Sequence, residues 1–326
     1  MLVTVFTVGL MVQLLWQNDT TEHTEAAKGH FAILMPVQTS DAGSVHTAIE
    51  QLAEEYSLAL EVHEFATVAD QKQMLRLLPS TEVDGVLLWP ISIDDTDYEE
   101  ELMNLKLEEV PVVIVERDVA QKQRDSFVGS GTTSDLMVLE QSLKGLEDRD
   151  CFVVANQSGS GNGQMVEWVI FRKAEWADSV LNTLPQDQKL RQLAQDPPEG
   201  YLAVEQIRLE GDGARSLQLK YALTTLFSEE KDLKLFFSLD ESLSTTAISA
   251  KKGLSAFKQA NLQLLCYGEK AKQQENLESG ILDGLVTSRP DISITVGIRY
   301  LRDICRDFWV PKTMDSGIDF LTANAE

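Results

Sequence analysis

The chain has 326 residues, of which 43% are hydrophobic, so it is long enough for two lobes and has the apolar content of an ordinary globular protein. It carries 52 Asp and Glu residues against 28 Lys and Arg residues, which gives a formal net charge of −24. A surface this acidic repels a phosphate backbone, which argues against nucleic acid as a partner. Cys151, Cys266 and Cys305 are too few and too scattered for a disulfide framework or a zinc site, and we expect no metal and no cofactor.

The N-terminal stretch is apolar. Residues 1–16, MLVTVFTVGLMVQLLW, contain no charged residue, whereas residues 17–30 are polar and are interpreted as a tether. A membrane-spanning helix needs about 20 apolar residues, and neither a preceding basic residue nor a clear small-residue cleavage site marks an export signal. Two interpretations stay open. The run is either an export signal or membrane anchor whose beginning is missing, or a buried core helix.

The next elements alternate between strand and helix. Residues 31–35 (FAILM) are a short apolar run that predicts a strand, and a second strand is predicted at residues 58–62 (LALEV), where large apolar residues alternate with Ala59 and Glu61. Val45, Ile49 and Leu52 mark one face of a helix between them. A second helix is expected at residues 70–78, where Pro79 ends it.

Residues 83–118 contain the pattern that defines the fold class. The runs 83–89 (VDGVLLW) and 112–115 (VVIV) are too short for core helices and end abruptly in polar or ring residues. Between them Tyr98, Leu102 and Leu105 recur at helical spacing behind an acidic start. Strands without alternation are buried on both faces, and parallel neighbours need such a crossover, so the pattern predicts an open α/β sheet.

Polar and ring side chains follow these two strands. In an open α/β sheet, ligands bind beyond the carboxyl ends of the strands, where Trp89, Glu116, Arg117 and Asp118 lie. The guanidinium of Arg117 offers five donors in a fixed fork, which suits vicinal hydroxyls or a carboxylate. The alternative for Arg117 is a structural ion pair with a neighbouring acid. The Trp89 ring either forms a wall of the site or packs in the core.

The remainder of the chain continues the alternation as a second set of βα units. Further strands are expected at residues 127–129, 151–155, 202–208, 235–238, 262–267, 285–288 and 318–321. Further helices are expected at residues 136–146, from the glycine loop at 159–163 through Trp176, and at 217–224, 243–257 and 294–308. Residues 181–200 are polar, contain three prolines and are interpreted as an irregular insertion.

Catalytic and nucleotide-binding motifs give little support to an enzyme. The glycine loop at 159–163 has Gln164 where the dinucleotide pattern has its third glycine. Neither a His-Glu-x-x-His helix nor a Gly-x-Ser-x-Gly elbow occurs, so we expect no enzymatic activity. An unmarked hydrolase with a carboxylate pair stays as an alternative, because fold alone does not decide activity.

The order of elements and several local phrases resemble the type 1 periplasmic binding proteins, in particular the ribose- and galactose-binding branch. The resemblance extends from Phe31 to the C-terminus and depends on the order and spacing of its phrases. The phrases are VDGVLLWPIS at 83–92, VPVVIVERD at 110–118, RKAEW at 172–176 and FFSLDESLSTTA at 236–247.

The resemblance implies two lobes joined by a three-stranded hinge, which close on a small polar ligand, most often a sugar. By analogy, residues 31–131 and 289–315 form the N-terminal lobe, and residues 132–288 and 316–326 form the C-terminal lobe. The protein is expected to be a monomer outside the cytoplasm, either membrane-anchored or secreted.

The same resemblance supplies candidate ligand-binding residues. Arg117 matches the family's ligand-clamping arginine, Arg172 the second-lobe arginine, and Asp240 the acid of an Asn-Asp pair. The loop after the first strand, residues 37–43, lacks the family's aromatic ring, and Leu239 replaces the Asn. The full set of candidates is Gln38, Ser40, Asp41, Trp89, Glu116, Arg117, Asp118, Arg172, Ser238, Asp240, Glu269 and Arg289.

Two functions follow from the resemblance. In the first, the protein binds a sugar or sugar derivative and delivers it to the permease of an ABC-type importer. In the second, it is a ligand sensor that presents its closed form to a membrane kinase or chemoreceptor. A repressor of the same fold needs a basic helix-turn-helix before the first strand, and residues 1–30 contain a single Lys and no Arg.

Overall fold

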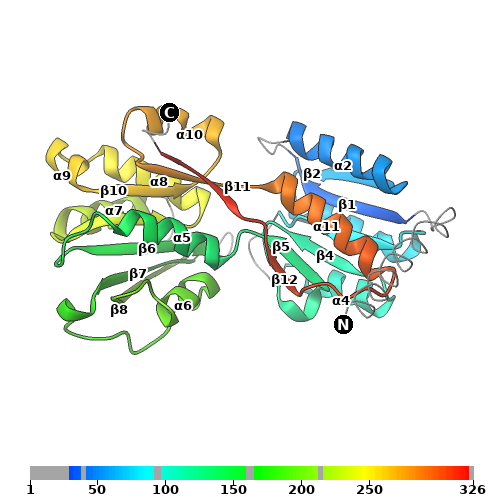
Figure 1. Ribbon diagram of the computed structural model, residues 1–326, viewed down its shortest axis with the longest axis horizontal. Helices are drawn as coiled ribbons and strands as arrows, with labels where there is room; N and C mark the ends of the chain where they lie inside the picture. The colour runs from blue at the N-terminus through cyan, green and yellow to red at the C-terminus, as the bar shows by residue number, and fades with distance from the viewer. Residues whose placement is uncertain (1–28, 38–41, 92–96, 159–164, 212–215, 323–326) are drawn as a thin grey trace, which may run out of the picture.

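A computed structural model describes residues 29–37, 42–91, 97–158, 165–211 and 216–322. These residues form two α/β lobes, each built on its own β-sheet (Figure 1). We call the lobe with the six-stranded sheet lobe A and the lobe with the seven-stranded sheet lobe B. The predicted N-terminal run, most of the tether, and the candidates Gln38, Ser40 and Asp41 lie outside the described residues. Among the residues that are described, no helix is both long and apolar enough to cross a membrane.

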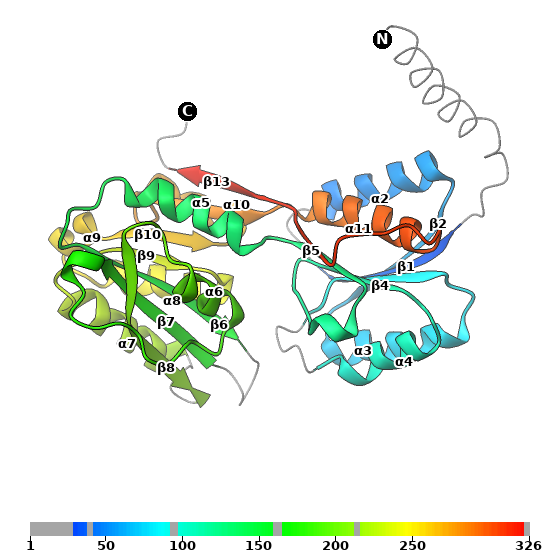
Figure 2. The ribbon, with the colours of Figure 1, turned by 60° about the horizontal axis from the view of Figure 1, so that its bottom comes forward.

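Lobe A has a parallel sheet with the strand order β12-β5-β4-β3-β1-β2. The strands are β1 (His30–Pro36), β2 (Ala59–Phe65), β3 (Gly85–Leu88), β4 (Val112–Val115), β5 (Ser126–Gly129) and β12 (Thr313–Asp315). Helices α2 (Ala42–Tyr56) and α11 (Pro290–Ile304) cover one face, and α3 (Val68–Leu77) and α4 (Glu99–Leu107) cover the other (Figure 2). Every residue of β3, β4 and β5 is buried, which explains the unbroken apolar sequences of β3 and β4.

Lobe B has a mixed sheet with the order β13-β11-β10-β9-β6-β7-β8. Its strands are β6 (Cys151–Ser158), β7 (Met165–Lys173), β8 (Tyr201–Glu210), β9 (Leu233–Ser238), β10 (Gln263–Tyr267), β11 (Gly284–Ser288) and β13 (Ile318–Thr322). Its helices are α5 (Thr132–Leu143), α6 (Gln188–Gln195), α7 (Ser216–Glu229), α8 (Glu241–Lys252), α9 (Ala256–Asn261) and α10 (Lys270–Glu278). Helices α5 and α6 pack on one face, and α7 and α8 pack on the other.

The helix predicted between the glycine loop and Trp176 is not present in the described residues. Instead, residues Met165–Lys173 form β7, which pairs antiparallel with both β6 and β8. Val166, Trp168 and Ile170 are buried on one face of this strand, and Val169 and Phe171 are buried on the other. A run that is buried on both faces has no alternation, so periodicity does not distinguish it from a buried helix.

Two other details of lobe B also differ from expectation. The segment 181–200 contains α6, whose first turn is capped by Asp187, because the Asp187 carboxylate accepts a 3.0 Å hydrogen bond from the Leu190 backbone N–H. In α7 the residues Leu217 and Tyr221, whose spacing indicated the helix, are exposed, whereas Leu219 and Leu223 are buried. The spacing of Leu217 and Tyr221 thus indicated the helix but not the side of it that packs on the sheet.

The described chain passes between the lobes after β5, after β11 and after β12. The third passage contacts the first passage through a side-chain hydrogen bond. The Asp315 carboxylate, at the third passage, accepts hydrogen bonds of 2.9 and 3.0 Å from the hydroxyl of Ser134, which follows the first passage. A Cβ atom at Gly131 would lie 2.8 Å from the same carboxylate, so a side chain at this position would displace the Asp315 carboxylate. The predicted fold class, two α/β lobes joined by a hinge, is confirmed, with the correction that the sheet of lobe B is mixed.

Candidate binding cleft

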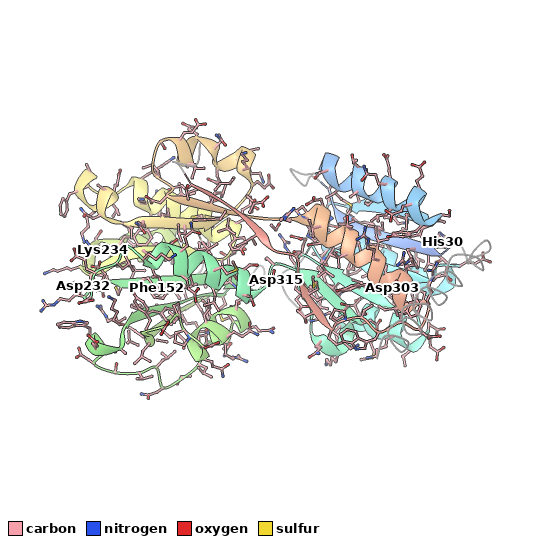
Figure 3. All side chains as sticks on the ribbon, viewed as in Figure 1. His30, Phe152, Asp232, Lys234, Asp303 and Asp315 are labelled. Atoms are coloured by element: carbon pink, nitrogen blue, oxygen red, sulfur yellow. The ribbon has the colours of Figure 1, made fainter. Side chains whose placement is uncertain are left out.

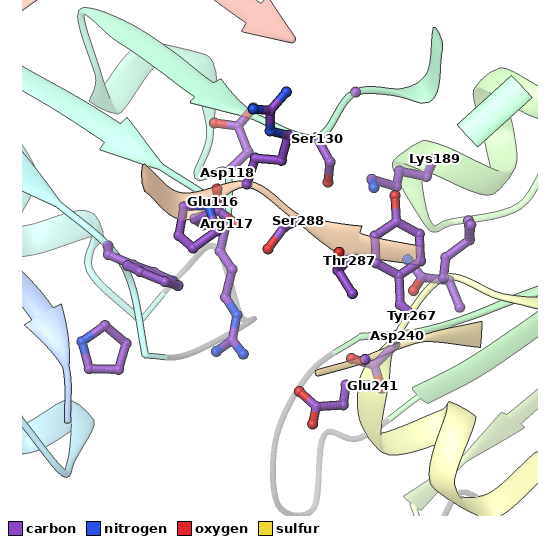
Figure 4. Close-up of a pocket in the computed structure, with 18 of the residues that line it drawn as sticks. Glu116, Arg117, Asp118, Ser130, Lys189, Asp240, Glu241, Tyr267, Thr287 and Ser288 are labelled. Carbon is purple, nitrogen blue, oxygen red and sulfur yellow. The ribbon is translucent and has the colours of Figure 1, made fainter. Parts of the chain in front are cut away.

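A cleft of about 1820 Å³ is lined by residues of both lobes. Its walls come from the chain just beyond the carboxyl ends of β3, β4 and β5 in lobe A and of β6, β9, β10 and β11 in lobe B. Figure 4 shows side chains from these strand ends turned toward one another. Seven of the predicted candidates line it: Trp89, Glu116, Arg117, Asp118, Asp240, Glu269 and Arg289. Their role in ligand binding stays a prediction.

Arg117 projects from lobe A into the cleft (Figure 4). One guanidinium nitrogen, Nη1, donates a 2.5 Å hydrogen bond to the carbonyl of Ile91. No carboxylate among the described residues forms an ion pair with it, so the alternative of a structural ion pair is not supported by the described part of the chain. As far as the described residues show, the guanidinium therefore has further N–H donors for a ligand.

Asp240 faces Arg117 from lobe B, where it caps α8 by accepting a 2.9 Å hydrogen bond from the Leu243 backbone N–H. Burial raises the pKa of the Asp240 carboxyl above its ordinary value, while the Leu243 N–H and the positive charge of Arg117 offset part of the rise. The neighbouring Glu241 and Glu269 both contact Lys272, at 3.4 and 2.8 Å. The lobe B wall thus presents acceptor oxygens opposite the donors of Arg117.

Glu116, which directly follows β4 and precedes Arg117, also lines the cleft. Its backbone has a φ of +65°, in the left-handed region that a residue with a side chain rarely adopts. Its carboxyl accepts a 2.5 Å hydrogen bond from the hydroxyl of Ser293 in the first turn of α11. Burial raises the pKa of Glu116, and hydrogen bonds from Ser293 and Ser288 counteract part of this rise. The Glu116 side chain therefore connects the end of β4 to α11, the helix that follows the second passage between the lobes.

Replacing Glu116 by Gln is expected to change how stability depends on pH. Because the folded-state pKa lies above the unfolded value of about 4.3, the contribution of Glu116 is fully present below that value and is lost as the pH rises. The Gln side chain keeps the acceptor for Ser293 and does not titrate. Urea unfolding from pH 4 to 7 should show the wild-type protein losing stability relative to E116Q. A difference that is constant with pH would contradict the assignment.

Asp118 and Trp89 line the cleft but have strong structural contacts. The Asp118 carboxylate accepts hydrogen bonds of 2.6 and 2.8 Å from Nε and Nη2 of Arg124, a bidentate ion pair. The Trp89 side chain is 8% exposed and belongs to the core of lobe A. The Trp89 carbonyl accepts a 2.9 Å hydrogen bond from Gln71, whose Oε1 accepts one of 2.6 Å from the Tyr98 hydroxyl. These contacts position the end of β3.

Comparison with known proteins identifies the architecture. No protein-family model matches the chain, and no curated protein matches its sequence. Among solved structures, the glucose-galactose binding protein GanP from Geobacillus stearothermophilus superposes with a TM-score of 0.65 at 12% identity, covering 91% of this chain and 98% of that chain. The arabinose binding protein AraP from the same organism gives a TM-score of 0.65 at 13% identity, covering 91% and 98%. A chain of the XylFII-LytSN complex gives 0.59 at 12% identity, covering 91% and 99%.

The chain has the type 1 periplasmic binding protein fold. The resemblance found in the sequence is thereby confirmed for the fold. The cleft described above lies between the two lobes of this fold.

Two candidates do not lie in the cleft of this periplasmic binding protein fold. Arg172 contacts Glu230 and Asp232 at 2.8 and 3.3 Å and pairs in the sheet with Cys151, at the amino end of β6. Because β7 is antiparallel to β6, the end of β7 lies at the sheet edge away from the cleft, so Arg172 is not among the residues that line the cleft. The Ser238 hydroxyl is buried and donates a 3.0 Å hydrogen bond to the Asp240 carbonyl.

The fold also brings in residues that the sequence did not indicate. Lys189 of α6 and Tyr267 of β10 line the cleft, and both contact the buried carboxylate of Asp135. The Lys189 ammonium lies 3.2 Å from Asp135, and the Tyr267 hydroxyl donates a hydrogen bond to it. Burial and the Asp135 charge raise the pKa of Tyr267 well above its ordinary value, so its hydroxyl stays protonated. Lys189 was missed because its segment was predicted to be irregular.

Proposed function

We propose that the protein is an extracytoplasmic solute-binding protein whose lobes close on a small polar ligand, a sugar or sugar derivative, for ABC-type import. The observation that carries this proposal is the position of Arg117 and Asp240. They project from different lobes into one cleft and are close enough for the charge of Arg117 to offset part of the rise that burial causes in the pKa of Asp240. A ligand with several hydroxyls accepts hydrogen bonds from the first side chain and donates them to the second, and so draws the lobes together.

The size of the cleft supports closure. Its volume of about 1820 Å³ exceeds the roughly 300–1,000 Å³ of sites that enclose a small ligand. A sugar in this space leaves most of its surface in water unless the lobes approach each other. We assign residues 31–131 and 289–315 to one moving body and residues 132–288 and 316–326 to the other.

The chemistry of the walls supports a hydroxylated ligand. The cleft is lined by acidic side chains, among them Asp187, Asp240, Glu241 and Asp319, and by cationic side chains, among them Arg117, Lys189 and Arg289. Donors and acceptors of both kinds suit hydroxyl groups, which need both. We propose a binding role without catalysis, as in the sugar-binding proteins of similar fold.

A second candidate function is supported by the similarity to a chain of the XylFII-LytSN complex. Because that chain of similar fold is part of a protein complex, the similarity favours a sensor function, in which the protein presents its closed form to a membrane kinase or chemoreceptor. The two functions share ligand binding and differ in the partner that contacts the closed form.

Thermal melting of the protein against glucose, galactose, arabinose, polyols and amino acids tests the proposal. A ligand at 100 times its dissociation constant stabilises the folded state by about 2.7 kcal/mol, which gives a visible shift of the melting temperature. We expect a shift with at least one sugar or polyol. A shift with amino acids alone, or with none of the compounds in a sample free of co-purified ligand, would contradict a sugar-binding function.

A further inference from the structure

Large apolar side chains are exposed at the end of lobe A that lies away from the cleft. Leu77 and Leu107, the last residues of α3 and α4, are 54% and 73% exposed. Phe308 and Trp309, which follow α11, are 62% and 86% exposed. Each helix runs back from the cleft to the edge where the strands of the parallel sheet begin, so the three helix ends lie at this one edge (Figures 1 and 2). We call these four residues the apolar end.

The chain enters lobe A at the same edge. His30 begins β1, and its backbone N–H donates a 2.8 Å hydrogen bond to the Asp84 carboxylate. Asp84 also accepts a 3.4 Å hydrogen bond from the Cys305 thiol at its backbone carbonyl, which places the end of α11 next to the chain entry. Figure 3 shows His30 and Asp303 at the end of lobe A that is remote from lobe B. The uncharged run of residues 1–16 is thus connected to the edge that exposes Phe308 and Trp309.

We propose that the apolar end rests on a lipid bilayer into which residues 1–16 insert. The 13 residues from 17 to 29 span at most about 45 Å when extended and about 20 Å as a flexible chain, so they hold this edge near the bilayer surface. Trp and Phe side chains favour the interface between lipid headgroups and acyl chains, where an apolar ring is partly dehydrated. The proposal does not depend on which ligand the cleft binds.

The charges around the apolar end define the kind of lipid. Glu82 and Asp84 precede β3, Glu108 and Glu109 precede β4, and all four are exposed at this edge. Anionic headgroups repel these carboxylates, so a zwitterionic surface such as phosphatidylcholine is the expected partner.

Fluorescence quenching by brominated lipid tests the contact. The full chain carrying Trp16→Phe, which removes the tryptophan of the apolar run, is reconstituted into phosphatidylcholine vesicles with and without bromine on the acyl chains. We expect the vesicles to carry the protein on flotation and the brominated lipid to quench part of its fluorescence. Adding Trp309→Phe should abolish that quenching.

The matched control is Trp176→Phe in the same background, because Trp176 is also exposed, at 44%, but belongs to lobe B. Quenching should survive this change. Three results would overturn the proposal: protein that does not float with the vesicles, absence of quenching in the Trp16→Phe protein, or quenching that persists after Trp309→Phe. Since Trp309 is exposed, its replacement should leave the melting temperature unchanged, and sugar binding serves as an independent check of the cleft.

Discussion

Replacing Arg117 by Ala is expected to weaken ligand binding by about 2–4 kcal/mol, or roughly 30- to 1,000-fold in the dissociation constant. The guanidinium lies in the cleft, and among the described residues it donates a hydrogen bond to the Ile91 carbonyl and forms no ion pair within salt-bridge distance. Its removal therefore takes charged donors from the ligand and little from the fold. Titration calorimetry, with the sugar that gives the largest melting shift, measures the affinity, and the melting temperature without ligand should barely change.

Two other substitutions make this prediction specific. Lysine at position 117 keeps the charge but loses the planar fork, so R117K should bind with intermediate affinity. R172A should show the opposite pattern, with unchanged affinity and reduced stability, because Arg172 pairs with Glu230 and Asp232 away from the cleft. A large loss of stability in R117A with unaltered affinity would make Arg117 a structural residue.

Replacing Lys251 by Ala is expected to lower the free energy of unfolding by about 3 kcal/mol, the largest stability effect that we predict. The Lys251 side chain is 1% exposed, and its ammonium lies 2.7 Å from the Asp283 carboxylate. That carboxylate also accepts a 2.8 Å hydrogen bond from the Leu264 backbone N–H, so the pair connects α8 to the start of β10. Because the Asp283 side chain is 39% exposed, we expect a value at the low end of the range for buried ion pairs.

Lys252 provides the control, since it is the next residue in the same helix and is exposed. Urea unfolding of K252A should lie within about 0.5 kcal/mol of the wild-type protein. K251M keeps most of the side-chain volume and should recover part of the loss. Equal stabilities of K251A and K252A would show that the buried pair contributes nothing.

The parts of the fold that were predictable from the sequence are those in which pattern and environment agree. The runs that became β3 and β4 are buried on both faces, and their lack of alternation predicted a parallel sheet. The same property misled at β7, where a run buried on both faces was assigned to a helix. In α7 the residues Leu217 and Tyr221 matched the helical period but faced solvent, because a period gives no information on which stripe faces the sheet.

The candidate site was predictable where it depends on strand ends. Arg117 follows the buried strand β4, so the rule for parallel sheets placed it at the cleft. Asp240 follows β9 and also lines the cleft, but it was named through the resemblance. Arg172 was taken from the resemblance alone, and it lies within the antiparallel strand β7, where it pairs with Cys151 at the amino end of β6. The contacts of Asp135 with Lys189 and Tyr267 join three elements far apart in the sequence, and no local pattern indicates such contacts.

Small-angle X-ray scattering with and without ligand tests most directly whether the lobes close. With the sugar selected by melting at a saturating concentration, we expect a smaller radius of gyration than for the free protein. The R117A variant should keep the larger value at the same sugar concentration. A wild-type scattering profile that is unchanged at full saturation, as measured by calorimetry, would contradict closure of the two lobes on the ligand.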